Sequence, residues 1–302
     1  DAHLSNFGGF AAPDRRLVFG LNDFDETLPG PFEWDVKRLV ASFAVARRDR
    51  GFDTKERRTV NLEGARAYRE AMAAFAGMRD LDVWYARLDK DEFMRLINQV
   101  ASKKQAKRTQ ESVVKAQTKD SLRAFAKLTE VVGGEPRIVS DPPLIVPIEE
   151  VAAGAGANAE QIEEYVQGVL SSYRETLTDD HRRLLEGFRY AHAARKVVGV
   201  GSVGSRAWIV LLLGRDVDDP LFLQIKQADR SVLEPFLGQS EFSNHGRRVV
   251  AGQRLMQAAS DIMLGWTRVD QFGVQADFYV RQLWDGKGSA DIDLLNPRAL
   301  TF

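Results

Sequence analysis

Apolar side chains recur every three or four residues along much of this chain, a spacing that gives a helix one buried face. In residues 31–48 the recurring positions are Phe32, Val36, Leu39, Val40, Phe43 and Ala44. The same pattern predicts further helices over residues 61–76, 91–127, 159–177, 178–194 and 247–263. Pro31 and Thr178 support two of these starts, because proline fits the first turn of a helix and threonine caps one.

Other stretches are rich in β-branched and aromatic residues and are bounded by turn residues, which is typical of strands. They cover residues 16–21, 196–200, 207–213, 221–227 and 277–284. Residues 131–147 are rich in glycine and proline, so we expect a linker that crosses between two lobes. The pattern therefore predicts an α+β protein with a mainly helical lobe at residues 1–194 and a β-rich lobe at residues 195–302.

Composition narrows the classes of function. The chain has 302 residues, enough for about two domains. It has no cysteine, which excludes disulfides, thiolate metal sites and a cysteine nucleophile. Lys and Arg number 42 against 43 Asp and Glu, so no net charge draws the chain to nucleic acid or to an acidic membrane. Its longest apolar run is far shorter than a membrane helix needs, and we expect a cytoplasmic protein.

The first segment that suggests chemistry reads Asp-Ala-His-Leu-Ser-Asn at the very start of the chain. Asp1 and Asn6 lie five residues apart, so on a tight loop both could reach one metal-bound phosphate. The carboxylate would accept a proton from an attacking hydroxyl, and the amide oxygen would occupy a Mg²⁺ position. The alternative is that the two side chains only cap a turn.

A second segment combines several carboxylates directly after a predicted strand. Residues 21–26 read Leu-Asn-Asp-Phe-Asp-Glu. A carboxylate at the end of a strand offers the hard oxygen ligand that Mg²⁺ prefers. Asp23 is the first candidate and Asp25 the second, and an ordinary acidic turn is an equally good interpretation.

A third segment carries the pattern G-x-G-x-x-G at Gly199, Gly201 and Gly204. A dinucleotide-binding loop would open a helix here, but the residues that follow, 207–213, are β-like. We therefore expect a glycine-rich turn between two antiparallel strands, which can cover the phosphates of a nucleotide. In the next strand Lys226 interrupts an apolar run and could reach those phosphates, with Glu241 as the acid that pairs with it.

Several stretches of the chain closely resemble the bacterial domain-of-unknown-function family 2252. They read DAHLSNFG, LNDFDETLPGPFEWDVKRL, VGVGSVGSRAWIVLL, PLFLQIKQA, NHGRRVVAGQRLMQAASDIMLGW and FYVRQLWDGKGS. The resemblance covers nearly the whole chain. It implies that the chain is a fragment, because members of that family extend past both of its ends.

That family in turn resembles, more distantly, the protein-kinase-like and aminoglycoside-phosphotransferase-like fold. There the catalytic loop reads roughly H-G-D-x-H-x-x-N, and a later Asp-Phe-Gly or similar motif holds Mg²⁺. Asp1, His3 and Asn6 match the first motif and Asp23 the second. The resemblance implies that Asp1 is the catalytic base, that His3 positions the loop, and that Asn6 and Asp23 bind Mg²⁺.

The order of the motifs departs from that fold. In kinases the glycine-rich loop and the lysine precede the catalytic loop, whereas here they follow it by about two hundred residues. Either the fold is circularly permuted, which is feasible where chain ends lie close together, or the glycine-rich turn does not belong to a nucleotide lobe. The usual glycine after Asp-Phe is also missing, so Asp23 and Asp25 compete for the metal.

These observations predict a two-lobed, kinase-like phosphotransferase that uses ATP and Mg²⁺. Its acceptor is a small hydroxyl compound or a protein, and neither nucleic acid nor a membrane is expected as a partner. Two other classes stay open: a catalytically silent nucleotide-binding module, and a metal-dependent phosphohydrolase built on Asp1, His3, Asp23 and Asp25. Among the other polar residues, Arg281 and Gln282 could line a pocket, although ordinary strand polarity explains them equally well.

Overall fold

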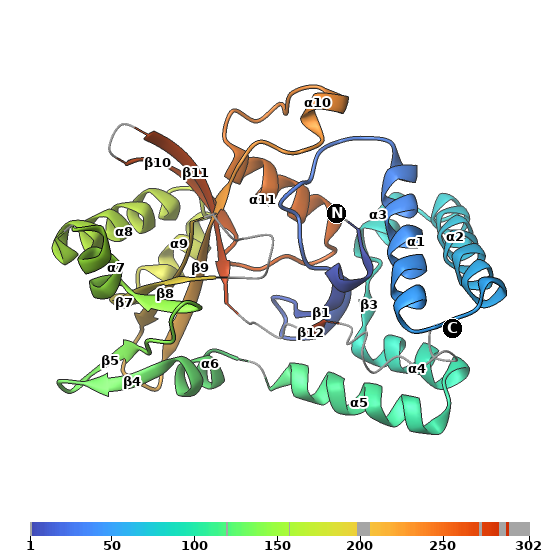
Figure 1. Cartoon of the computed structure of the whole chain (residues 1–302), viewed down its shortest axis with the longest axis horizontal. Coiled ribbons are helices and arrows are strands. Elements are labelled where there is room, and N and C mark those ends of the chain that lie inside the picture. The colour runs from blue at the N-terminus through green and yellow to red at the C-terminus, as the bar shows by residue number, and fades with distance from the viewer. Residues whose placement is uncertain are drawn as a thin grey trace. The chain divides into compact units, whose positions relative to one another are not determined.

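The structure, a computed structural model, combines helices with antiparallel sheets (Figure 1). It describes residues 2–118, 120–156, 158–197, 206–271, 274–283 and 288–289. The chain divides into two compact units. Unit 1 comprises Asp1–Thr118, Gln253–Ala259 and Gly286–Phe302, and unit 2 comprises Lys119–Gly252 and Ser260–Asp285. These units do not coincide with the expected division at residue 194.

Unit 1 is built on a four-stranded sheet with the strand order β12-β1-β2-β3. The strands are β1 (Phe7–Ala11), β2 (Leu17–Leu21), β3 (Leu88–Asp89) and β12 (Gly288–Ser289). The helices are η1 (Leu4–Asn6), α1 (Phe32–Asp49), α2 (Thr54–Ala76), α3 (Asp80–Tyr85), α4 (Lys90–Val100) and α5 (Lys103–Gln117). Leu17 packs in one core cluster with Met94, Val113 and Ala116, which joins the sheet to α4 and α5.

The six-stranded antiparallel sheet of unit 2 has the strand order β10-β11-β9-β8-β7-β6. Its strands are β6 (Ile145–Pro147), β7 (Arg189–Lys196), β8 (Ala207–Leu213), β9 (Pro220–Ala228), β10 (Gly265–Gln271) and β11 (Val274–Gln282). A separate hairpin joins β4 (Thr129–Val132) to β5 (Glu135–Ile138). Its turn contains Gly133 and Gly134, whose positive φ angles of 62° and 87° suit residues without a Cβ.

Helices cover both faces of this sheet. The helices of this region are α6 (Ser121–Leu128), α7 (Ile148–Ala155), α8 (Ala159–Arg174), α9 (Asp179–Leu185), α10 (Glu234–Leu237) and α11 (His245–Met256). Every residue of β8 is buried. Trp208, Val210 and Leu212 pack with α7, α8 and α9 in one cluster. Ile209, Leu211 and Leu213 face the opposite way and pack with α6 in a second cluster. The alternation of side chains along a central strand therefore supplies two hydrophobic cores.

Several predicted elements are confirmed. Strands β2, β8 and β9 and helix α1 lie where the hydrophobic pattern predicts them, within one or two residues at each end. Helix α2 begins at Thr54, seven residues before the predicted start at Asn61, because Asp53 and Glu56 form a capping box there. Residues 131–147, expected as a linker, contain strands β5 and β6 and the end of β4.

Three helix predictions need correction. The helix expected over residues 91–127 is three helices, α4, α5 and α6, because Ser102 and Asp120 cap two new starts. The helix expected over residues 178–194 ends at Leu185, and residues 189–196 form β7. The helix expected over residues 247–263 runs from His245 to Met256.

Among the described residues, no helix combines the length and the apolar character that crossing a membrane requires. The fold is thus a mixed α and β fold with antiparallel sheets, as expected. Its kinase-like, permuted character stays a prediction.

Candidate functional site

The first candidate group lies at one end of the β1–β2 hairpin in unit 1. Phe7 pairs with Leu21, so the residues before β1 and after β2 meet at the same end of the sheet. The backbone N–H of Asn22 donates to the carbonyl oxygen of Asn6 at 2.9 Å and extends this contact by one residue. The pairing therefore brings Asp23 close to the segment that carries the two other predicted site residues, His3 and Asn6.

Short-range hydrogen bonds shape both segments. The N–H of Leu4 donates to Ser42 Oγ at 3.0 Å and ties η1 to α1. After β2, the N–H of Asp25 donates to Asp23 Oδ1 at 3.4 Å, and Thr27 N–H donates to the carbonyl of Phe24 at 3.0 Å. Asp23 therefore takes part in the turn, as the acidic-turn interpretation expects, and this contact leaves its second carboxylate oxygen for another role.

The charges around His3 favour a neutral ring. Its pKa is lowered, first because burial disfavours the charged form and next because Arg38 repels a second positive charge. Asp23 acts in the opposite direction and raises the pKa of His3. The lowered pKa favours the neutral form of His3, and the carboxylate of Asp23 lies close enough to oppose this effect.

The donor set at this hairpin end suits a hard cation. Asn6 offers an amide oxygen and Asp23 a carboxylate, and Mg²⁺ commonly binds one or two such groups while phosphate oxygens and water complete its shell. Among the described residues, no three His, Asp or Glu side chains lie close enough together to hold a metal ion. The assignment of Asn6 and Asp23 as Mg²⁺ ligands stays a prediction. The predicted base, Asp1, lies outside the described residues.

The second candidate group belongs to unit 2. Strands β7 and β8 pair antiparallel. The strand expected at residues 196–200 overlaps β7 only at Lys196, and residues 198–200 lie outside the described residues. The glycine-rich segment, with Gly199, Gly201 and Gly204, lies outside the described residues. Lys226 pairs with Ala207, the first residue of β8, and on its other side with Tyr279 of β11. The lysine therefore lies beside the strand into which the glycine-rich segment leads.

The pairing of Lys226 with Glu241 stays a prediction. Glu241 is exposed on the segment that precedes α11. The other nearby acid, Glu234, is buried in α10, where its Oε2 accepts a hydrogen bond from Arg230 Nε at 2.7 Å. Glu234 thus already has a cationic partner on its own segment.

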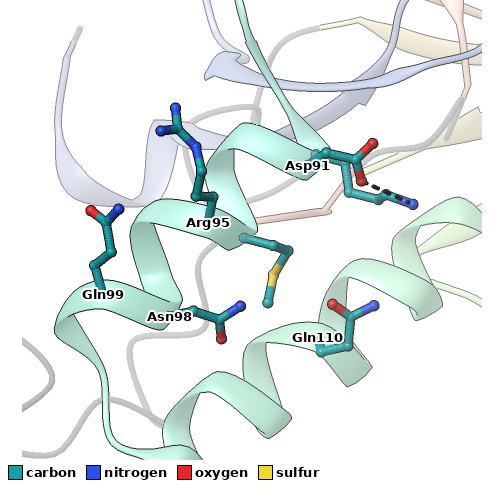
Figure 2. Close-up of a pocket in the computed structure, with 7 residues that line it drawn as sticks. Asp91, Arg95, Asn98, Gln99 and Gln110 are labelled. Atoms are coloured by element: carbon teal, nitrogen blue, oxygen red, sulfur yellow. Dashed lines mark ion pairs between the residues drawn. The ribbon is translucent and has the colours of Figure 1, made fainter.

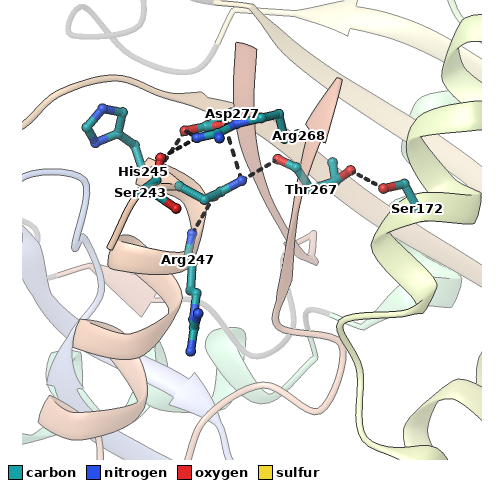
Figure 3. A network of polar contacts seen from close by, with 8 residues as sticks. Ser172, Ser243, His245, Arg247, Thr267, Arg268 and Asp277 are labelled. Carbon is teal, nitrogen blue, oxygen red and sulfur yellow. Dashed lines mark hydrogen bonds and ion pairs between the residues drawn. The ribbon is translucent and has the colours of Figure 1, made fainter. Parts of the chain in front are cut away.

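A network around Asp277 was not foreseen from the sequence (Figure 3). Asp277 Oδ1 and Oδ2 accept hydrogen bonds from Arg268 Nε at 2.6 Å and Nη2 at 2.9 Å. Oδ1 also accepts from Asn244 Nδ2 at 3.1 Å, and Oδ2 accepts from the backbone N–H of His245 at 2.7 Å. Asn244 Oδ1 in turn caps α11 by accepting from Arg247 N–H at 2.8 Å. The network fixes the start of α11 against the β10–β11 hairpin.

Part of this network leaves a signal in the sequence. An asparagine directly before a helix is a common cap, and the Ser-Asn-His-Gly segment offers one. The partnership of Asp277 with Arg268 has no such signal, because it depends on the register that places these two residues opposite each other.

A pocket of about 500 Å³ opens between α4 and α5 in unit 1 (Figure 2). It is lined by Lys90, Asp91, Met94, Arg95, Asn98, Gln99 and Gln110. Its three charged residues are all paired, Lys90 with Asp91 at 3.7 Å and Arg95 with Glu92 at 3.0 Å. None of the predicted site residues lines this pocket, so it adds nothing to the candidate chemistry.

Comparison with known proteins identifies the family but no characterised relative. No curated protein matches the chain. No solved structure matches it either. Over residues 1–302 the chain matches the family described as "Uncharacterized protein conserved in bacteria (DUF2252)". The match spans the whole chain and agrees with the resemblance of its motifs, so the protein belongs to this bacterial family.

Proposed function

We propose that the protein is a phosphotransferase that moves the γ-phosphate of ATP to a hydroxyl group of an acceptor with the help of Mg²⁺. The observation that carries the proposal is the pairing of Lys226 with Ala207 at the start of β8. This pairing puts a cationic side chain beside the strand that follows Gly199, Gly201 and Gly204. A glycine-rich turn offers backbone N–H groups to phosphate oxygens, and a neighbouring lysine adds a positive charge.

The groups at the β1–β2 hairpin end have complementary roles. Asn6 and Asp23 provide oxygen ligands, and His3 holds the loop that carries Asn6. Mg²⁺, when bound, would neutralise negative charge on the phosphate oxygens. Asp1 accepts the proton of the acceptor hydroxyl as the oxygen of that hydroxyl forms a bond to the γ-phosphorus. The bond from this phosphorus to the bridging oxygen breaks, and ADP leaves with that electron pair.

A thermal-shift experiment tests nucleotide binding directly. The melting temperature of the 302-residue chain is measured with ATP, with Mg²⁺ and with both together. At a free nucleotide concentration of 100 times Kd, binding stabilises the folded state by about 2.7 kcal/mol, which raises the melting temperature by several degrees. We expect the full shift only with ATP and Mg²⁺ together. No shift under any of these conditions would contradict the proposal.

Transfer is then separated from hydrolysis and from silent binding. ADP formation is followed with a panel of small hydroxyl compounds and without an acceptor. We expect ADP only when an acceptor is present, whereas a phosphohydrolase releases ADP and phosphate without one. Asp1→Ala should abolish transfer and leave the thermal shift unchanged. Unchanged turnover in this variant would exclude Asp1 as the base.

A further inference from the structure

One face of the sheet in unit 2 changes from apolar to polar along two neighbouring strands. On β9 the alternate residues are Phe222, then Gln224 and Lys226, and Gln224 pairs with Arg281 of β11 while Lys226 pairs with Tyr279. Side chains that are paired across strands lie on the same face. We call four neighbouring polar residues of this face, which lie beyond Asp277 on β11 and its partner Ala228 on β9, the polar strip. They are Gln224, Lys226, Tyr279 and Arg281.

Each end of the polar strip is bounded by a helix of the same unit. Towards one end, Phe222 and Leu283 continue the face as part of the core that α6 covers. Towards the other end, Asp277 lies two residues before Tyr279 and holds the start of α11. There the α11 backbone approaches so closely that a Cβ on Gly246 would collide with the carbonyl oxygen of Phe278. The polar strip is thus the part of the face between α6 and α11.

Two contacts within the polar strip fix the position of the Arg281 guanidinium. Arg281 Nε donates to Gln224 Oε1 at 3.0 Å, and the Arg281 guanidinium carbon lies 5.6 Å from the centre of the Tyr279 ring. Gln224 is 3% exposed, and among the described residues its Nε2 amide group has no hydrogen-bond acceptor. A buried donor without an acceptor is destabilising, which is expected where a ligand supplies the acceptor.

The chemistry of these groups indicates the class of ligand. The side chains of Lys226, Arg281 and Gln224 all carry N–H donors. Their one acceptor, Gln224 Oε1, already accepts a hydrogen bond from Arg281 Nε. Two cations and an amide donor on one sheet face suit an oxyanion, and a guanidinium suits phosphate in particular.

We propose that the polar strip binds the phosphate groups of a ligand, with Arg281 and Gln224 in direct contact with its oxygens beside Lys226. This inference rests on the proposed function, because it names further residues of the same phosphate site. It assigns a binding role to Gln224 and gives a specific class of ligand to Arg281, which the sequence offered only as a residue that could line a pocket. Arg281 supplies charge and Gln224 supplies the buried donor.

The test uses two variants that keep the packing of the sheet. Arg281→Gln removes the charge and retains a side chain that can hydrogen-bond to Gln224. Gln224→Glu keeps an acceptor for Arg281 Nε but replaces the amide donor with a negative charge. Two exposed positions of the same sheet serve as matched controls, Arg189→Gln on β7 and Gln275→Leu on β11.

The measurement is isothermal titration of each variant with Mg²⁺·ATP and, separately, with inorganic tripolyphosphate. We expect both strip variants to bind each probe at least tenfold more weakly than the parent chain and both controls to bind within twofold of it. Gln224→Glu should also melt no lower than the parent chain without ligand, because a carboxylate pairs with Arg281 at least as well as an amide does. If Gln224 had only a structural role, Gln224→Glu would not weaken binding while leaving the melting temperature unchanged.

The outcomes separate this inference from the proposed function. Tight binding of ATP that is unchanged in both strip variants would overturn the role of the strip and leave the phosphotransferase proposal standing. Binding of tripolyphosphate that depends on Arg281 and Gln224, together with no binding of ATP, would support the strip and contradict the nucleotide function. Failure of the parent chain to bind either probe would overturn both.

Discussion

His192 is a buried titratable residue that holds three elements of unit 2 together. It lies on β7 and is 2% exposed. Its Nδ1 accepts the backbone N–H of Ile138 on β5 at 2.9 Å, and its Nε2 lies 3.1 Å from Glu149 Oε2 on α7. A ring that accepts at Nδ1 and donates at Nε2 is neutral, so a second proton would have to break the bond to Ile138.

We therefore predict that unit 2 loses stability in mild acid. Burial lowers the pKa of His192, with a smaller effect of Arg137 in the same direction, although Glu149 opposes them. As the pH falls below the ordinary histidine pKa of about 6.5, His192 takes up a proton in the unfolded chain but stays neutral in the folded chain. The free energy of unfolding should fall with it. Denaturant titrations between neutral pH and about pH 5.5 measure this slope.

His192→Asn provides the comparison for this pH dependence, because its amide oxygen can still accept from Ile138 but does not titrate. The variant should be less stable at neutral pH and should show a smaller pH slope than the parent chain. His192→Ala should cost about 1–3 kcal/mol, since it leaves a buried N–H without an acceptor. An equal slope in the parent chain and in His192→Asn would assign the acid sensitivity to other groups, such as His3, whose pKa is also lowered.

Single Asp→Asn substitutions show which of the two acids after β2, Asp23 or Asp25, is the metal ligand. Asp23 adjoins Asn22, whose N–H bonds to Asn6, whereas Asp25 lies two residues further into the turn. We predict that Asp23→Asn raises the Mg²⁺ concentration needed for half of the ATP-dependent thermal shift by about tenfold or more, because a charged ligand is lost. The amide oxygen of this variant would still accept from Asp25 N–H, so the turn is retained. If Asp25→Asn has the larger effect, Asp25 is the metal ligand.

At the scale of elements, the hydrophobic pattern predicted the buried strands well and the ends of the helices less well. Residues 207–213 and 221–227 contain continuous apolar runs that only a central strand buries on both faces, and they form β8 and β9. Residues 189–196 contain three alanines, which favour a helix in isolation. They form β7 because pairing with β8 overrides this local preference. Capping at Ser102 and Asp120 was visible in the sequence, but the helical pattern on either side concealed it.

The attachment of α11 to the β10–β11 hairpin depends on one carboxylate. The Asp277 side chain is 6% exposed, and it accepts from Arg268, Asn244 and the first N–H of α11. We predict that Asp277→Asn lowers the free energy of unfolding by about 1–3 kcal/mol, because it weakens hydrogen bonds to a buried carboxylate, although the partner Arg268 is 39% exposed. Hydrogen exchange should show the greatest loss of protection at the first turn of α11.

An exposed acid of the same unit serves as the control for this prediction. Asp218→Asn, in the loop between β8 and β9, should change stability by less than about 0.5 kcal/mol. If Asp277→Asn is as mild as this control, the network does not anchor α11.

At the scale of the whole molecule, the sequence suggested a chemistry for each candidate group but not its surroundings. The Asn6 and Asp23 motifs could be recognised because their spacing and residue types are characteristic, and the pairing of Phe7 with Leu21 unites them. The bond between Arg281 and Gln224 could not be foreseen, since it needs the register of β9 and β11, which are separated by about fifty residues of chain. Long-range pairing is the information that a single sequence lacks.

The two units have separate hydrophobic cores. The clusters that line the two faces of the large sheet lie wholly in unit 2. The cluster of Leu17, Met94, Val113 and Ala116 lies wholly in unit 1. Regions with their own buried cores can open independently, so damage to one core need not spread to the other.

We predict that Leu211→Ala destabilises unit 2 alone. Leu211 is fully buried between His192 of β7 and Phe222 of β9, and such a truncation costs about 2–5 kcal/mol. In native-state hydrogen exchange, the amides of β7, β8 and β9 should lose protection by that amount while those of β2 keep theirs. Met94→Ala, in the core of unit 1, should give the reverse pattern. An equal loss of protection in both units from either variant would mean that the chain unfolds as one cooperative body, because only a shared transition transmits a local cavity to every protected amide.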